Sequence, residues 1–111
     1  MNVEKPWGQY KVLADEADFK VKIITVAPKK RLSLQSHMMR DERWCIISGR
    51  GVVTVETDSM VESGDTIFIP RGKKHRVRNV SEMELVFVEV QTGDYFGEDD
   101  VVRFEDDFGR T

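Results

Sequence analysis

The sequence predicts an all-β fold, an antiparallel sandwich or barrel, and three observations predict it. Short runs alternate apolar and polar side chains, turn residues separate the runs, and no stretch has the periodicity of an amphipathic helix. Strands at such close spacing are typical of antiparallel sandwiches and barrels. The expected strands are 9–13, 19–26, 31–39, 43–48, 52–57, 65–70, 75–80 and 84–91.

The fourth of these strands, 43–48, ends before Gly49 and contains an apolar run. The bulk of Trp44 favours packing in the core over stacking against a sugar. Cys45 is the single cysteine, so an internal disulfide is excluded. Its place among apolar residues predicts a small buried side chain.

The segment 64–79 carries the most specific pattern in the chain, with the spacing G-x5-P-x-G-x2-H-x3-N. Gly64 ends a turn, a short strand follows, and Pro70 and Gly72 bend the chain before the next strand begins at His75. This segment resembles the second cupin motif. The resemblance implies the cupin double-stranded β-helix, a jelly-roll barrel, with His75 aimed into its interior.

The resemblance also implies a first motif upstream that closes with a glycine, and residues 32–49 fit that place. Cupins usually take two metal ligands from an H-x-H pair, a third a few residues later and a fourth from the second motif. In this chain those places hold His37, Met39, Arg43 and His75. Because only the two histidines are good ligands, the implied metal site is degenerate.

Almost the whole chain resembles the type II mannose-6-phosphate isomerase domain. The segments that carry this resemblance are 6–10, 19–22, 32–35, 89–93 and 97–104. It implies an enzyme that interconverts mannose 6-phosphate and fructose 6-phosphate in nucleotide-sugar and polysaccharide precursor metabolism. In bifunctional members this domain follows a guanylyltransferase domain, which needs a Gly-rich nucleotide loop. The sequence contains no such loop, so we expect no nucleotidyl transfer from this chain alone and consider a guanylyltransferase a candidate partner.

Strand parity indicates which side chains face the pocket. Successive side chains alternate between the two faces of a strand, so Gln35, His37 and Met39 share one face, which the resemblance places inward. On the strand 84–91, Glu89 lies on the face opposite three valines. The pattern leaves open whether that face lines the pocket or faces solvent.

The implied isomerisation moves a proton between adjacent carbons through an enediol. It needs an activating cation or acid, a base, and a cationic group that holds the phosphate. With His37 and His75 as anchors, Gln35 and Glu42 or Glu89 could complete the ligand shell of zinc or a similar divalent metal.

Two residues argue against tight metal binding. Met39 is a soft thioether with little affinity for zinc, and Arg43 would place a positive charge beside the ion. We therefore expect the metal to be weakly bound or absent in the protein as isolated. Arg43 is expected either to turn out of the pocket toward an acidic neighbour or to put its guanidinium in the cation's place. The alternative function is a metal-poor, non-catalytic cupin that binds a sugar phosphate or a nucleotide sugar.

The remaining charged candidates are bases and phosphate ligands. Glu42, Glu89 and Glu98 are candidate bases, since a carboxyl group in a partly closed pocket can have its pKa raised. Arg103 is a further candidate for the catalytic site, with a surface ion pair as the alternative. Arginine suits bidentate capture of a phosphate, and the candidate substrate-binding cations are Lys22, Lys30, Arg31, Arg43, Arg103 and Arg110.

Length and charge exclude several classes of protein. At 111 residues with 40% hydrophobic content, residues 1–111 are expected to form one domain around one core. The net charge of −3, with both signs interleaved, argues against nucleic-acid and membrane-surface binding. No run is long enough for a membrane span and no signal peptide is recognisable, so the cytoplasm is the expected location. We expect a homodimer, in which the N-terminal strand could add to a partner's sheet edge.

Overall fold

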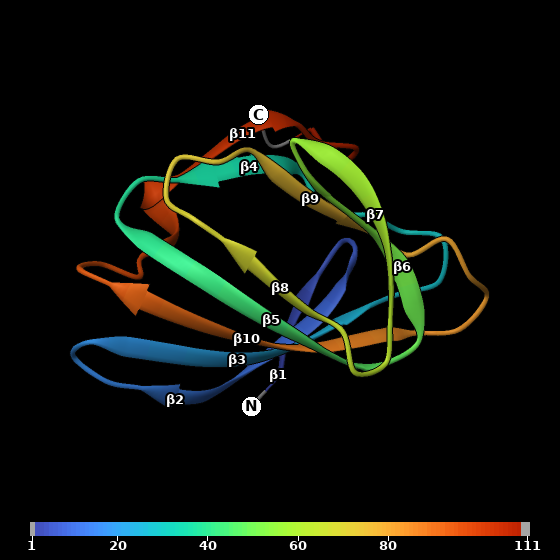
Figure 1. Ribbon diagram of the computed structural model, residues 1–111, viewed down its shortest axis with the longest axis horizontal. Helices are drawn as coiled ribbons and strands as arrows, with labels where there is room; N and C mark the ends of the chain where they lie inside the picture. Colours follow the sequence, from blue (N-terminus) through green and yellow to red (C-terminus); the bar gives the residue numbers. More distant parts are fainter. Residues whose placement is uncertain (1, 110–111) are drawn as a thin grey trace.

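A computed structural model describes residues 2–109, which form two antiparallel sheets packed face to face (Figure 1). The six-stranded sheet has the order β1-β2-β3-β10-β5-β8, and the five-stranded sheet has the order β11-β4-β9-β6-β7. The predicted all-β fold is confirmed. The elements are β1 (Asn2–Lys5), β2 (Gly8–Asp15), β3 (Phe19–Val26), β4 (Leu34–His37), β5 (Arg40–Ser48), β6 (Arg50–Val55), β7 (Thr57–Glu62), β8 (Thr66–Ile69), β9 (His75–Arg78), β10 (Leu85–Gly93), the 3-10 helix η1 (Glu98–Asp100) and β11 (Val101–Glu105).

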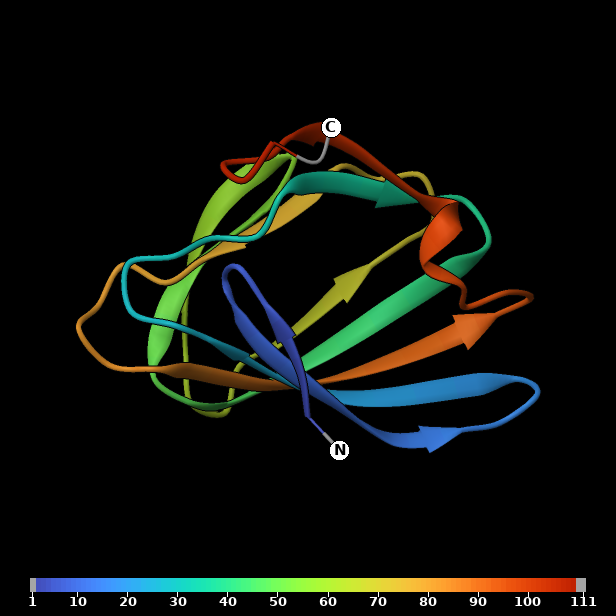
Figure 2. The ribbon, with the colours of Figure 1, turned by 180° about the vertical axis from the view of Figure 1, so that it is seen from behind.

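The space between the sheets is apolar at one end. Trp44 packs there against Phe87, with ring centroids 4.6 Å apart, which confirms its predicted place in the core. Trp7 joins this core from the turn between β1 and β2, and Figure 2 shows that hairpin reaching toward the space between the two layers. The buried apolar side chains are Trp7, Ile24, Val26, Trp44, Ile46, Val53, Val61, Ile69, Val77, Leu85 and Phe87.

The other end of the interior is polar, because the inward side chains of the central strands change from apolar to polar along each strand. On β10, the inward face continues from Phe87 to Glu89 and Gln91. On β5, the inward face begins with Arg40 and Glu42 before it becomes apolar. All of these side chains are buried. The face of Glu89, which the sequence left open, therefore lies inside the barrel, and the three valines of β10 lie on its outer side.

Three details of the sequence prediction are wrong. Cys45 is exposed rather than buried, because the alternation on β5 turns its neighbours Trp44 and Ile46 inward. The expected strand 52–57 is broken at Glu56, whose positive φ of 69° reverses the chain into β7. The strands β1, β7 and β11 were not expected from the alternation pattern.

The N-terminal strand β1 pairs with β2 of the same chain and forms an edge of the six-stranded sheet. Addition of this strand to a partner's sheet stays a prediction. The described part of the chain contains no helix with the length and apolarity that crossing a membrane requires.

Candidate active site

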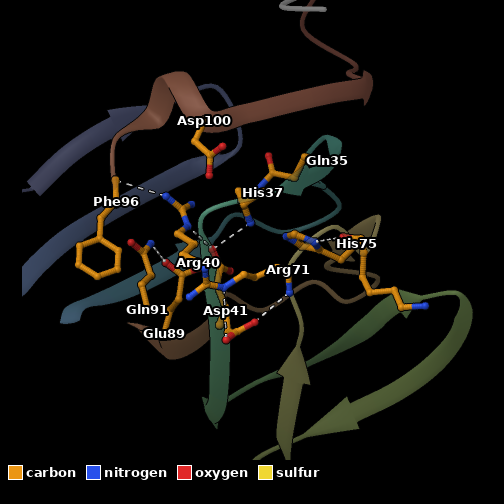
Figure 3. Close-up of polar contacts among 12 residues, drawn as sticks. Gln35, His37, Arg40, Asp41, Arg71, His75, Glu89, Gln91, Phe96 and Asp100 are labelled. Carbon is orange, nitrogen blue, oxygen red and sulfur yellow. Dashed lines mark hydrogen bonds and ion pairs between the residues drawn. The ribbon is translucent and has the colours of Figure 1, made fainter. Parts of the chain in front are cut away.

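Three buried side chains with metal-ligating atoms meet at the polar end of the barrel. His37 comes from the end of β4, Glu42 from β5 and His75 from the start of β9, and their ligating atoms lie within 4.8 Å of one another. The imidazole centroids of His37 and His75 are 4.7 Å apart. Figure 3 shows these two rings side by side with Arg40 next to them. The sequence-based expectation that both histidines point into one barrel interior is confirmed.

The turn of the second motif brings the two histidines together. Gly72 adopts a positive φ of 78°, a conformation that favours glycine, and its amide donates to the carbonyl oxygen of His37 at 2.7 Å. In addition, Gln35 on β4 is the register partner of His75 on β9. The loop 70–74 is therefore attached to the end of β4, which sets the distance between the imidazoles.

The hydrogen bonds of His75 leave one ring nitrogen available. Its Nδ1 lies 2.9 Å from the carbonyl oxygen of Lys73, so Nδ1 carries the proton and donates. Its Nε2 is buried and has no hydrogen-bond partner among residues 2–109. A histidine fixed through one nitrogen with a free lone pair on the other is the usual arrangement of a metal ligand.

Burial keeps both imidazoles neutral. Desolvation and the nearby charge of Arg40 lower the pKa of His37 to about 3, and desolvation also lowers the pKa of His75. The 3.3 Å contact between His37 Nδ1 and Glu42 Oε2 is therefore not an ion pair, since the ring carries no charge. Since metals bind the neutral imidazole, this protonation state suits a ligand role.

The carboxylate of Glu42 is held by neighbours on its own strand. Arg40 Nε donates to Oε2 at 2.9 Å, and the indole Nε1 of Trp44 donates to Oε1 at 3.0 Å. His37, Glu42 and His75 thus fit a divalent metal as two nitrogen ligands and one oxygen ligand, the number that catalytic zinc sites use. The sequence missed Arg40, although strand parity with Glu42 and Trp44 could have found it.

Arg43 does not line the pocket, which corrects its assignment as a substrate ligand. Because Glu42 and Trp44 face inward, Arg43 between them faces outward, is exposed, and lies over the ring of Phe68 at 4.7 Å from the centroid. It turned out of the pocket as one alternative expected, but toward an aromatic ring rather than an acidic group. The carboxylate of Glu42 occupies the inward place instead.

Met39 is also absent from the cluster, although it was expected to share the inward face with His37. The strand β4 ends at His37, and Met38 and Met39 form a bend. Their amides donate to the carboxylate of Asp100, at 3.4 and 3.0 Å, and the Met39 side chain is 43% exposed. The Asp100 carboxylate thus holds a bend that the alternation pattern did not indicate.

A pocket of mixed charge adjoins the triad. The sequence-predicted residues that line it are Lys22, Gln35, Glu89, Glu98 and Arg103. Gln35 lies next to His37, with 3.4 Å between the two Nε2 atoms. The complete lining is Lys5, Trp7, Tyr10, Lys22, Ile24, Leu32, Ser33, Gln35, Arg40, Glu89, Glu98 and Arg103.

The other predicted phosphate ligands lie elsewhere. Lys30 is exposed on the loop before β4, and Arg31 makes two hydrogen bonds of 2.7 Å to the carboxylate of Asp107. Neither side chain lines the pocket, which corrects both assignments. Arg110 lies outside the described residues.

The three candidate bases differ in environment. Burial, together with the charge of Glu42, raises the pKa of Glu89 to about 8, and Gln91 Nε2 donates to its Oε2 at 2.7 Å. Burial opposes ionisation of Glu98, but the charges of Lys22 and Arg40 outweigh it and lower the pKa of Glu98. Glu89 is therefore the carboxyl group that can hold or release a proton near neutral pH.

Two further buried polar atoms point to a polar ligand. Within residues 2–109, Arg103 Nε and Gln91 Oε1 are buried without a hydrogen-bond partner. Buried polar groups are seldom left unpaired unless a function accounts for them. Lys5 and Tyr10, from the N-terminal strands, also reach this pocket, and the alternation pattern gave no signal for them.

The fold and most of the chain are shared with known proteins. The structure superposes on the capsular polysaccharide assembling protein CapF of Staphylococcus aureus with a TM-score of 0.84 at 17% identity, over 95% of this chain and 34% of that chain. It also superposes on Bacillus subtilis oxalate decarboxylase with a TM-score of 0.80 at 23% identity, over 94% of this chain and 30% of that chain. These similarities confirm the cupin fold.

Sequence relatives are more informative. The chain is 44% identical to the xanthan biosynthesis protein XanB of Xanthomonas campestris, over 98% of this chain and 24% of that protein. It is 42% identical to the alginate biosynthesis protein AlgA of Pseudomonas putida, over 100% of this chain and 23% of that protein. It is 39% identical to a mannose-1-phosphate guanylyltransferase of Escherichia coli, over 97% of this chain and 23% of that protein. The chain thus spans about a quarter of the length of these relatives.

The family model described as mannose-6-phosphate isomerase C-terminal matches residues 1–106, which include every residue of the triad and of the pocket lining. The chain therefore belongs to the family of mannose-6-phosphate isomerase C-terminal domains, built on a cupin barrel.

Proposed function

We propose that this chain is a type II mannose-6-phosphate isomerase domain that interconverts mannose 6-phosphate and fructose 6-phosphate, with a divalent metal held by His37, Glu42 and His75. The observation that carries the proposal is the buried triad beside a pocket that combines a protonated carboxyl group with cations. The names of relatives that make xanthan and alginate support a role in polysaccharide precursor synthesis.

A divalent ion on the triad would polarise the sugar carbonyl. The protein's own part is the movement of the proton. Glu89 is flanked on the sheet by Lys22 and Trp44, and Gln91 orients its carboxyl group. A carboxyl group with a pKa of about 8 is matched to taking a proton from one carbon and returning it to the next near neutral pH.

The cations of the pocket hold the phosphate. Lys22 and Arg103 face the pocket from opposite sheets, and the unpaired Nε of Arg103 is a donor available to a phosphate oxygen.

The test is isomerisation in deuterated water with added divalent metal. Solvent deuterium on the carbon that receives the proton would show transfer through an enediol, and its extent reports how far the proton held by Glu89 exchanges with solvent before it is returned. Glu89→Gln should lower kcat by roughly 10²- to 10⁴-fold, since it removes the group that carries the proton. Glu82→Gln, an exposed glutamate remote from the pocket, is the matched control and should match the unmodified protein.

An undiminished kcat in Glu89→Gln would remove Glu89 from the mechanism.

One observation favours the second candidate function, a metal-poor cupin that binds a sugar phosphate without converting it. Arg40 Nε lies 2.9 Å from Glu42 and neutralises that carboxylate without a metal. Binding of mannose 6-phosphate by the metal-free protein, together with no isomerisation after metal is added, would establish this candidate.

A further inference from the structure

Two cations of the pocket, Lys22 and Arg40, pair with the same carboxylate, Glu98, and both contacts are long. Glu98 Oε2 lies 3.8 Å from Lys22 Nζ and 3.7 Å from Arg40 Nη1. Close charge-assisted hydrogen bonds measure about 2.7–2.9 Å. Lys5 and Arg103 line the same pocket and add to its positive charge. Glu98 therefore balances a cationic group of side chains without bonding tightly to any of them.

The burial of the partners is unequal. The side chains of Lys22 and Arg40 are 6% and 3% exposed, whereas that of Glu98 is 48% exposed. Glu98 belongs to η1, between the end of β10 and β11 at the rim of the barrel (Figure 1). The cations are thus fixed parts of the barrel, and the anion that they hold sits on a short rim segment in contact with solvent.

The pocket is too small for a sugar phosphate while Glu98 occupies this position. The enclosed space is about 50 Å³, room for a few water molecules, whereas pockets for small molecules usually measure about 300 Å³ or more. Entry of a hexose phosphate therefore requires the rim to open. The ion pairs of Glu98 are the contacts that an incoming anion would replace.

We propose that Glu98 is a built-in competing anion that occupies the phosphate subsite of Lys22 and Arg40 until a dianionic phosphomonoester displaces it. The proposal rests on the proposed function in taking the ligand to be a sugar phosphate. A monoanion that displaces Glu98 regains only the attraction that the carboxylate gives up. A dianion carries twice the charge and gains more from the two cations than Glu98 loses, so a dianion displaces Glu98 more readily than a monoanion does.

The experiment measures binding of two simple anions, sulfate as a dianion and acetate as a monoanion, by NMR titration of the full chain. The unmodified protein should bind sulfate and show little binding of acetate. Glu98→Gln keeps the shape and removes the competing charge, so the affinities for sulfate and for acetate should both rise, by roughly tenfold. The preference for sulfate over acetate should persist, because Glu98 competes equally with both anions. Asp99→Asn, a neighbouring carboxylate that bonds to the Tyr95 hydroxyl, is the control and should retain the original affinities.

Lys22→Gln locates the subsite, because it should abolish sulfate binding in the Glu98→Gln background while the thermal transition shows that the protein still folds. Equal anion affinities in Glu98→Gln and the unmodified protein would overturn the proposal. So would sulfate binding that survives Lys22→Gln. Neither readout uses turnover or a metal, so the isomerase proposal and this one can fail separately.

Discussion

Glu89 is a buried residue whose surroundings differ greatly from bulk water. It lies inside the barrel near a second carboxylate, Glu42, and its pKa is raised to about 8 from a usual value of 4.5. His37 is shifted in the opposite sense, with a pKa lowered to about 3 from 6.5. Both shifts favour the neutral form of a buried group. The site therefore holds Glu89 and both imidazoles uncharged, beside the buried cations Lys22 and Arg40.

The shift of Glu89 predicts how stability depends on pH. Between about pH 4.5 and 8, folded Glu89 keeps a proton that the unfolded chain has lost, so the free energy of unfolding falls as pH rises. His37 acts in the opposite direction, but only between about pH 3 and 6.5. From pH 6.5 to 8 the decline should therefore come from Glu89. Urea unfolding at several pH values should show this decline in the unmodified protein and its loss in Glu89→Gln. An equal decline in both proteins would contradict the buried, protonated Glu89.

Arg40 and Arg43 lie three positions apart and should behave differently. Arg40 is buried against Glu42, and removal of one partner of a buried pair typically costs about 3–5 kcal/mol. Arg43 is exposed on the outer face, where substitutions usually change stability by about 0.5 kcal/mol or less. Urea unfolding of Arg40→Gln and Arg43→Gln compares them directly. Similar losses for the two variants would show that the inward and outward faces of β5 are assigned wrongly.

Among the strands, β5 determines much of the arrangement of the site. Its alternation places Arg40, Glu42 and Trp44 inside and Arg43 and Cys45 outside. The family pattern placed Arg43, a poor ligand, at the position of the third metal ligand, whereas the parity of this strand, anchored on a bulky tryptophan, points to Glu42. The two indications differ because a motif specifies only the number of residues between two positions. A shift of one residue along a strand moves a side chain to the opposite face.

The outward face of β5 predicts the reactivity of the single thiol. Cys45 is exposed, so a thiol reagent such as DTNB should modify one equivalent in the native protein without denaturant. Modification should leave the far-UV circular dichroism unchanged, because the side chain is outside the core. A thiol that reacts only after unfolding would show that Cys45 is covered, either by the barrel or by a second subunit.

At the scale of the whole molecule, the interior is divided between an apolar end that stabilises the fold and a polar end that forms the site. Alternation predicted the central strands, since β3, β5 and β10 contain long regular runs. It missed the edge strands β1, β7 and β11, because these strands bury very few side chains and so carry little apolar–polar alternation.

The site was predictable only in part, because only some of its residues lie in recognisable motifs. His37 and His75 lie in motifs with fixed spacing, and the structure brings them together. Lys5 and Glu98 come from the two ends of the chain, and no local pattern indicates that both segments meet at one rim. Three-dimensional proximity of distant segments is information that a single sequence does not carry.

The central claim is that His37, Glu42 and His75 hold the metal on which isomerisation depends. The expectation of weak binding rested on Met39 and Arg43, which lie outside the cluster, so weak binding would now have to come from the competition of Arg40 for Glu42.

The most direct measurement follows isomerisation of mannose 6-phosphate and metal content together, first after dialysis against a chelator and then during titration with zinc, manganese or cobalt. We expect no activity in the metal-free protein, full activity at one equivalent of bound metal, and loss of both binding and activity in His75→Ala, with Met39→Ala unaffected. Full activity in the metal-free protein, or stoichiometric metal binding in His75→Ala, would show that the triad does not hold a metal needed for isomerisation.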